Sequence, residues 1–190
     1  MKFLSKLFIF FGLLLCLLGS YQVYLRFHPN TLEFANYSPT VSEQKQVDET
    51  PVRIVSNDLQ ISLPIIPAII DNNIWETTDK GVSYLSSSPL PGEKGNSILY
   101  GHNWTSLFGN LTRAIPGQTV EIYFADGTKK RFIIEYTSVV DPSESSILAQ
   151  SQDTRITLYT CTGFLDSKRF VAVAILDDQK DSLGRLLEEK

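Results

Sequence analysis

Short, strand-like runs separated by turn residues fill the chain from Val52 onward. The runs are rich in valine, isoleucine, tyrosine and phenylalanine, and glycine, proline, asparagine or aspartate stands between many of them. The candidate strands are Val52–Val55, Leu59–Pro64, Gly81–Leu85, Ser97–Tyr100, Thr119–Phe124, Lys130–Val139, Arg155–Thr160 and Arg169–Leu176. Helix is expected only within Ser106–Ile115, and as one turn within Ser143–Gln150. This pattern predicts a mainly β domain, either a closed barrel or a sandwich.

The N-terminal segment has a different character. Lys2 and Lys6 precede Leu7–Leu25, a stretch without any charged side chain. As a helix it would span about 28 Å, close to the hydrocarbon thickness of a bilayer. No small-x-small cleavage site follows, and Tyr21 and Tyr24 extend the span, which favours a signal-anchor over a cleaved signal peptide. The lysines before the span predict a cytoplasmic N-terminus and an extracytoplasmic domain.

These signals divide the chain into five parts. We expect a short cytoplasmic N-terminus (residues 1–6), a transmembrane signal-anchor (7–25), an extracytoplasmic stalk (26–51), a folded domain (52–177) and a charged C-terminal tail (178–190). The stalk is assigned because that segment is polar, rich in serine, threonine, glutamine, glutamate and proline, and without sustained periodicity.

Charge and cysteine content exclude several function classes. Three of the 17 basic residues lie before position 27 and no acidic residue does, which leaves 14 basic against 21 acidic residues in the rest. Such an acidic body argues against a nucleic-acid partner. The chain has only two cysteines and two histidines, and Cys16 lies in the apolar span. A disulfide to Cys161 and a structural zinc site are therefore disfavoured, and we expect no metal and no cofactor.

One cysteine stands at the end of a predicted strand. The alternation along Arg155–Cys161 places Cys161 on the face opposite Ile156 and Leu158. A short connection leads to the next run, which favours antiparallel pairing of the two strands. That pairing would bring Arg169, at the start of the second strand, close to Cys161 at the end of the first.

A thiol, an imidazole and a guanidinium together could perform covalent catalysis. A thiolate is the nucleophilic form of cysteine, histidine transfers protons near neutral pH, and arginine keeps its charge and stabilises an oxyanion. Spacing alone does not show that Cys161, His102 and Arg169 meet. Taken singly, a buried apolar role for the cysteine and a structural role for the histidine are the commoner cases.

The flanking motifs resemble one known family. TLYTC (Thr157–Cys161) followed by Arg169 resembles the TLxTC…R signature of sortases, which are membrane-anchored cysteine transpeptidases. GNSILYGHNW (Gly95–Trp104) is similar to the family's strand that leads into a Gly-His pair, and the resemblance runs in order from about residue 54 to 176. It implies an eight-stranded β-barrel over 52–177. Asn103 follows the histidine where many members carry arginine, which leaves the subfamily open.

The resemblance also implies a site and a reaction. His102, Cys161 and Arg169 would be the catalytic residues, and Thr160 would either donate a hydrogen bond near the oxyanion or serve strand packing. The substrates would be secreted proteins with a C-terminal sorting signal similar to LPxTG, cleaved through an acyl-enzyme thioester at the membrane. The acceptor would be an amine, either a cell-wall precursor or a pilin lysine.

Two other functions remain open on the same residues. A hydrolytic cysteine peptidase would use the same site, with water in place of the amine. A catalytically silent, anchored binding domain would have no reason to retain a cysteine, histidine and arginine together. Trp104, close after the histidine, could shield the site, line a groove or belong to the core.

Overall fold

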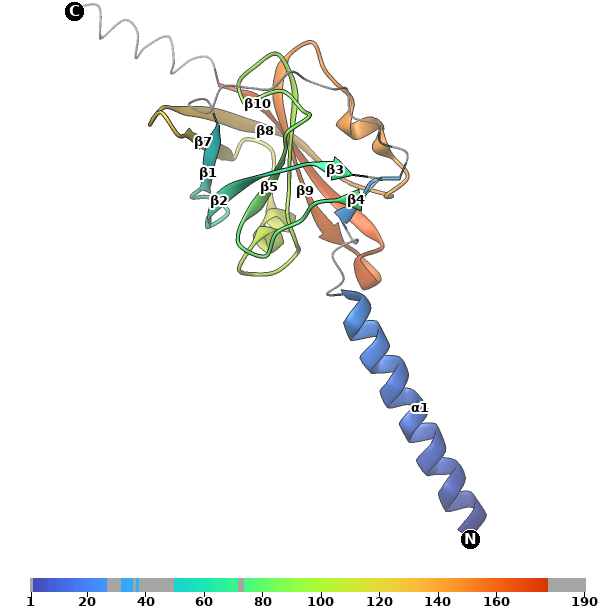
Figure 1. The fold of residues 1–190 in the computed structure, drawn as a ribbon. Coiled ribbons are helices and arrows are strands. Elements are labelled where there is room, and N and C mark those ends of the chain that lie inside the picture. The colour runs from blue at the N-terminus through green and yellow to red at the C-terminus, as the bar shows by residue number, and fades with distance from the viewer. Residues whose placement is uncertain (1, 27–31, 36, 38–49, 72–73, 178–190) are drawn as a thin grey trace, which may run out of the picture.

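The computed structural model describes residues 2–26, 32–35, 37, 50–71 and 74–177 of the chain. The expected tail (178–190) and most of the expected stalk lie outside the described residues. Eight strands form a closed barrel in the order β1-β2-β5-β6-β9-β10-β8-β7 (Figure 1). The predicted mainly β class is confirmed, and the fold is the barrel and not the sandwich.

All eight predicted strands are present, most of them one or two residues longer than predicted. The barrel strands are β1 (Pro51–Ser56), β2 (Ile61–Ala68), β5 (Val82–Leu85), β6 (Gly95–Tyr100), β7 (Thr119–Phe124), β8 (Lys129–Val140), β9 (Thr154–Thr162) and β10 (Lys168–Leu176). A small antiparallel ribbon, β3 (Ile70–Asp71) with β4 (Ile74–Trp75), was not predicted. The expected helical segments are short 3-10 helices, η3 (Phe108–Arg113) and η4 (Ser145–Leu148), and η5 (Phe164–Asp166) lies between β9 and β10.

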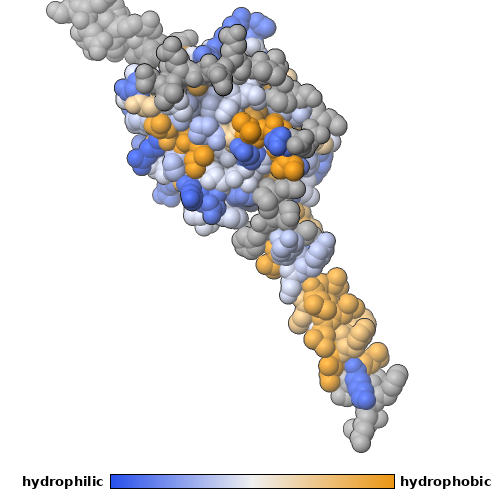
Figure 2. Space-filling model, viewed as in Figure 1, coloured by the Kyte–Doolittle hydropathy of each residue, from blue (hydrophilic) through white to orange (hydrophobic). Residues whose placement is uncertain are grey.

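A single α-helix, α1 (Lys2–Arg26), precedes the barrel and projects away from it (Figure 1). The side chains between Leu7 and Tyr24 are exposed, and the face seen in Figure 2 is apolar over most of the helix and more polar next to the barrel. Lys6–Tyr24 is long and apolar enough to cross a membrane. A helix whose side chains are exposed along its length and mostly apolar is a candidate membrane anchor.

The inside of the barrel is filled by one apolar cluster to which all eight strands contribute. Alternate residues of each strand point inward, as the pleat of a strand requires. On β9 these are Ile156 and Leu158, both at most 1% exposed. The predicted placement of Ile156 and Leu158 on the face opposite Cys161 is therefore confirmed.

A second apolar cluster covers the outer face of β6, β9 and β10. It contains Tyr159 and Cys161 from β9, together with Leu32, Phe34 and Trp75 from segments outside the barrel. The central strand β9 is thus buried on both faces, which is why its sequence lacks exposed polar positions near the end. Cys161 is only 2% exposed as a result.

The start of β5 depends on a glycine. β5 pairs parallel with β2, and Gly81 comes directly before its first residue. A Cβ atom at Gly81 would lie 2.3 Å from the carbonyl oxygen of Pro64 in β2. A side chain at this position would therefore force the two strands apart.

We expect Gly81→Ala to lower the free energy of unfolding by about 1–3 kcal/mol, the usual cost of overpacking. Thermal unfolding of the full chain in detergent, followed by circular dichroism, measures the effect. Glu135→Ala, at an exposed position of β8, is the control and should unfold close to the wild-type temperature. Equal stability of the two variants would contradict the predicted clash.

Candidate active site

Strand register brings the three predicted catalytic residues to one end of the sheet. β9 lies between β6, with which it pairs parallel, and β10, with which it pairs antiparallel. Arg169 is the direct partner of Cys161, and Tyr100 is level with Tyr159. Because parallel partners advance together, His102 follows its strand at the level of Cys161. The side-by-side placement expected for Cys161 and Arg169 is confirmed.

Hydrogen bonds fix the segment that carries His102. The amide of Gly101 donates to the carbonyl of Tyr159 at 3.3 Å, and the hydroxyl of Thr160 donates to the carbonyl of Gly101 at 2.7 Å. The amide of Phe108 donates to the carbonyl of His102 at 3.1 Å. Thr160 is fully buried, and its hydroxyl holds the residue before His102 against β9. The oxyanion role of Thr160 stays a prediction.

His102 is buried and has two carboxylates nearby. Its ring stacks on Trp104 with 4.7 Å between the ring centroids and a 12° interplanar angle. Burial lowers the pKa of His102 below its usual value, while the negative charges of Asp166 and Asp79 partly raise that pKa. Because burial dominates, the imidazole is neutral at pH 7, the form that accepts a proton.

Arg169 is buried but bonds to carbonyl groups. Its Nη1 donates to the carbonyl oxygens of Asp166 at 3.0 Å and Lys168 at 3.1 Å, and its Nη2 donates to that of Glu33 at 2.9 Å. Its Nε has no hydrogen-bond partner among the residues that the structure describes. A buried N–H without an acceptor is costly, so this group is ready to bind one.

A short part of the expected stalk packs on this site. The carbonyl of Leu32 accepts a hydrogen bond from the Tyr159 hydroxyl at 3.1 Å. The Phe34 ring meets the Tyr159 ring edge-on at 5.0 Å, and the Arg169 guanidinium lies 6.0 Å from its centroid. We call Leu32–Phe34 the cover segment. Two apolar residues flanking Glu33 are the sequence signal for it, since alternate residues of an extended chain share a face.

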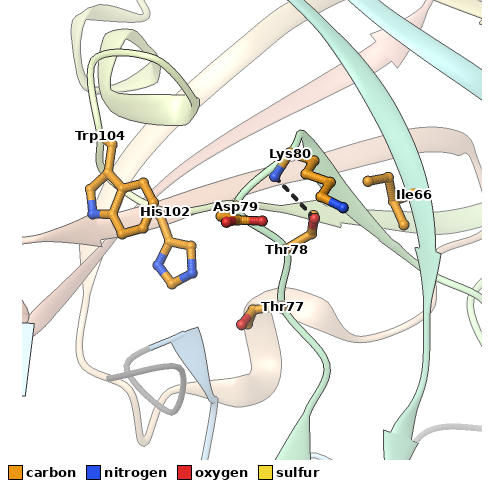
Figure 3. Close-up of a pocket in the computed structure, with 7 residues that line it drawn as sticks. All are labelled: Ile66, Thr77, Thr78, Asp79, Lys80, His102 and Trp104. Atoms are coloured by element: carbon orange, nitrogen blue, oxygen red, sulfur yellow. Dashed lines mark hydrogen bonds between the residues drawn. The ribbon is translucent and has the colours of Figure 1, made fainter. Parts of the chain in front are cut away.

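A pocket of about 620 Å³ opens beside His102 on the side of Trp104 (Figure 3). Residues 77–80, between β4 and β5, line it together with Ile66 of β2. Trp104 is partly exposed and lines this pocket. This agrees with a groove-lining role for Trp104 and disagrees with a place in the hydrophobic core. Asp79 in the lining was not singled out from the sequence, because only the fold brings it close to His102.

A family model described as a sortase domain matches residues 54–177, which includes nearly all of the barrel. The chain belongs to the sortase family. The suspected resemblance is confirmed, and the fold agrees with it. The matched region contains His102, Cys161 and Arg169.

Individual sortases are similar to the chain over the same region. Sortase A of Listeria monocytogenes serovar 1/2a is 33% identical over 115 residues, covering 58% of this chain but only 50% of that protein. The crystal structure of Listeria monocytogenes sortase A matches with a TM-score of 0.54 and 26% identity, over 68% of this chain and 88% of that one. Sortase C-1 of Actinomyces oris matches with a TM-score of 0.57 and 27% identity, over 69% and 76%. Because sortases of both the A and C types match, the subfamily stays unassigned.

We expect the pKa of His102 to lie below 6.5 and to fall further in Asp166→Asn, because removing a negative charge disfavours the imidazolium. NMR titration of the imidazole protons measures both values. The chain has only two histidines, so a His28→Gln background leaves a single signal. Asp141→Asn, which removes a carboxylate paired with Lys168, is the charge-matched control. A His102 pKa above 6.5, or one unmoved in Asp166→Asn, would refute this electrostatic description.

We expect Phe34→Ala to make Cys161 react faster with iodoacetamide, because it removes part of the buried cluster above the thiol. The rate should rise severalfold, measured by intact mass in a Cys16→Ser background so that only one thiol reacts. Phe34→Leu keeps an apolar side chain at that position and should react close to the wild-type rate. Equal rates for all three proteins would mean that the cover segment does not protect the thiol.

Proposed function

We propose that the chain is a cysteine transpeptidase that cleaves a C-terminal sorting signal similar to LPxTG in secreted proteins. It would transfer the released acyl group to an amine at the cell surface. The observation that carries the proposal is the row formed by Cys161 of β9, Arg169 of β10 and His102, which lies two residues beyond the end of β6. Membership of the sortase family supports the same assignment.

The first half of the reaction forms a thioester. Neutral His102 accepts the thiol proton of Cys161, and the resulting thiolate attacks the carbonyl carbon before the scissile bond, which gives a tetrahedral intermediate with an oxyanion. When this intermediate collapses, the carbon–nitrogen bond breaks and the His102 imidazolium donates a proton to the leaving amine. The products are an acyl-enzyme on Cys161, a free amine and neutral His102.

The second half reverses these roles. An incoming amine attacks the thioester carbonyl, and neutral His102 accepts a proton from its nitrogen. The carbon–sulfur bond breaks, which returns the thiolate of Cys161 and the imidazolium of His102. The lowered pKa of His102 suits this step, because the ring is already in its basic form.

Arg169 would hold the substrate backbone and stabilise the oxyanion. Its Nε is unpartnered among the described residues, and its Nη2 bonds a backbone carbonyl, that of Glu33. A substrate carbonyl could bind in place of that carbonyl with the same geometry. A guanidinium bound only to neutral carbonyls keeps its charge available, and this is what an oxyanion needs.

The helix α1 would anchor the enzyme in the membrane with the barrel on the extracytoplasmic face. Lys6–Tyr24 fits the thickness of a bilayer. The five-part division of the chain, with 52–177 as the catalytic domain, belongs to the same proposal. An anchored enzyme would meet secreted substrates as they leave the membrane.

We expect Cys161→Ala to abolish cleavage of a fluorogenic peptide containing Leu-Pro-Glu-Thr-Gly, because no other described side chain supplies the nucleophile. The matched control is Cys16→Ala, which removes the other thiol from the exposed surface of α1 and should cleave at the wild-type rate. Residual cleavage by Cys161→Ala would contradict the proposal.

Product analysis with and without triglycine then separates transfer from hydrolysis. Hydrolysed peptide as the sole product in the presence of triglycine would favour the peptidase alternative.

A further inference from the structure

The two sides of the catalytic row differ in how open they are. On the Arg169 side, the cover segment and the outer apolar cluster bury the site, and Phe34 is only 3% exposed. On the His102 side, the 620 Å³ pocket opens to solvent. An acceptor must bring its nitrogen to the thioester and to His102 at the same time, so the open side is its shortest approach.

The pocket carries charges suited to a primary amine. Asp79 is the only acidic residue of its lining, and the hydroxyl-bearing Thr77 and Thr78 lie next to it in the chain. In the view of Figure 3, Asp79 lies between His102 and Lys80. Its carboxylate is near enough to His102 to act on the charge of that ring. Amines are protonated in water at neutral pH, so a carboxylate at this point attracts them.

We propose that this pocket is the acceptor site of the enzyme, in which Asp79 binds the ammonium group of the incoming primary amine beside His102. The inference rests on the proposed transpeptidase function and adds the residue that recruits the second substrate. Asp79 acts on acceptor binding and takes no part in forming the thioester.

The protons of this step balance as follows. The bound ammonium loses one proton to the solvent-open pocket and becomes a neutral amine. As its nitrogen bonds to the thioester carbonyl, a second proton passes to His102 and the carbon–sulfur bond breaks. The products are an amide with one N–H, the thiolate of Cys161 and the imidazolium of His102, which is the state that begins the next cycle.

Lys80 limits which amines fit. Its side chain lines the same pocket and extends toward Ile66, away from His102 (Figure 3). A positive charge there repels an acceptor that carries further cations next to its amine. The pocket therefore suits an amine with neutral or acidic neighbours, and Lys80→Gln should improve transfer to a lysine-rich peptide.

The test measures how the acyl-enzyme divides between transfer and hydrolysis. The full chain in detergent micelles is given the Leu-Pro-Glu-Thr-Gly peptide and triglycine, and both products are quantified by mass spectrometry. Because both products arise from one acyl-enzyme and both reactions use His102 as the base, changes in the rate of acylation cancel from their ratio.

Asp79→Asn should lower the ratio of transfer to hydrolysis about tenfold, and Asp79→Glu should restore much of it. Glu135→Gln removes one negative charge from an exposed site on β8 and should leave the ratio unchanged.

The salt dependence of the ratio of transfer to hydrolysis is a second measurement. A purely structural role of Asp79 would not change this dependence. Raising the ionic strength should lower the ratio for the wild type and leave Asp79→Asn nearly unaffected, since attraction of an ammonium is screened. If Asp79→Asn forms the acyl-enzyme and its ratio of transfer to hydrolysis equals that of the wild type, the inference is overturned and the proposed function stands. Absence of any acyl-enzyme on Cys161 in the wild type would overturn both.

Discussion

The pairing of β9 with a neighbour on each side is the constraint on which the site depends. A parallel register with β6 and an antiparallel register with β10 are fixed at the same time on one strand. Cys161 therefore acquires a cationic neighbour from one side and an imidazole from the other without any long loop to position them. A slip of one residue in either register would turn a side chain to the opposite face of the sheet. The apolar filling of the barrel makes such a slip costly, because it would also remove Ile156 and Leu158 from the barrel interior.

The buried surroundings of Arg169 leave the positive charge of its guanidinium available to a substrate. The described residues offer it carbonyl oxygens and no carboxylate partner. Carbonyl dipoles accept hydrogen bonds from Nη1 and Nη2 without cancelling the charge of the guanidinium, whereas an ion pair would have neutralised it. The cover segment supplies one of these carbonyls from Glu33 and the aromatic ring of Phe34. The same contacts hold Arg169 in place and occupy the position that a substrate backbone would take.

His102 stands at the boundary between this buried region and the open pocket. Burial favours the neutral ring, while the negative charges of Asp166 and Asp79 moderate the effect. Because burial outweighs the two carboxylates, the neutral ring is the favoured form, and the imidazolium forms when His102 takes up a proton within the cycle. In the reaction we propose, the acyl donor would bind along Arg169 and the acceptor would arrive from the side of Trp104.

The sequence by itself determined the eight barrel strands, the opposite faces of β9 that carry Cys161 and Leu158, and the antiparallel pairing of β9 with β10, because these follow from alternation and short connections. It also pointed to Cys161, His102 and Arg169, through motifs and not through periodicity. Only the tertiary structure decided that β6 runs parallel to β9, since that contact joins residues about 60 positions apart. The packing of Leu32 and Phe34 and the approach of Asp79 to His102 were likewise decided by the fold. Such contacts depend on how a closed barrel brings distant segments together, and no local pattern records them.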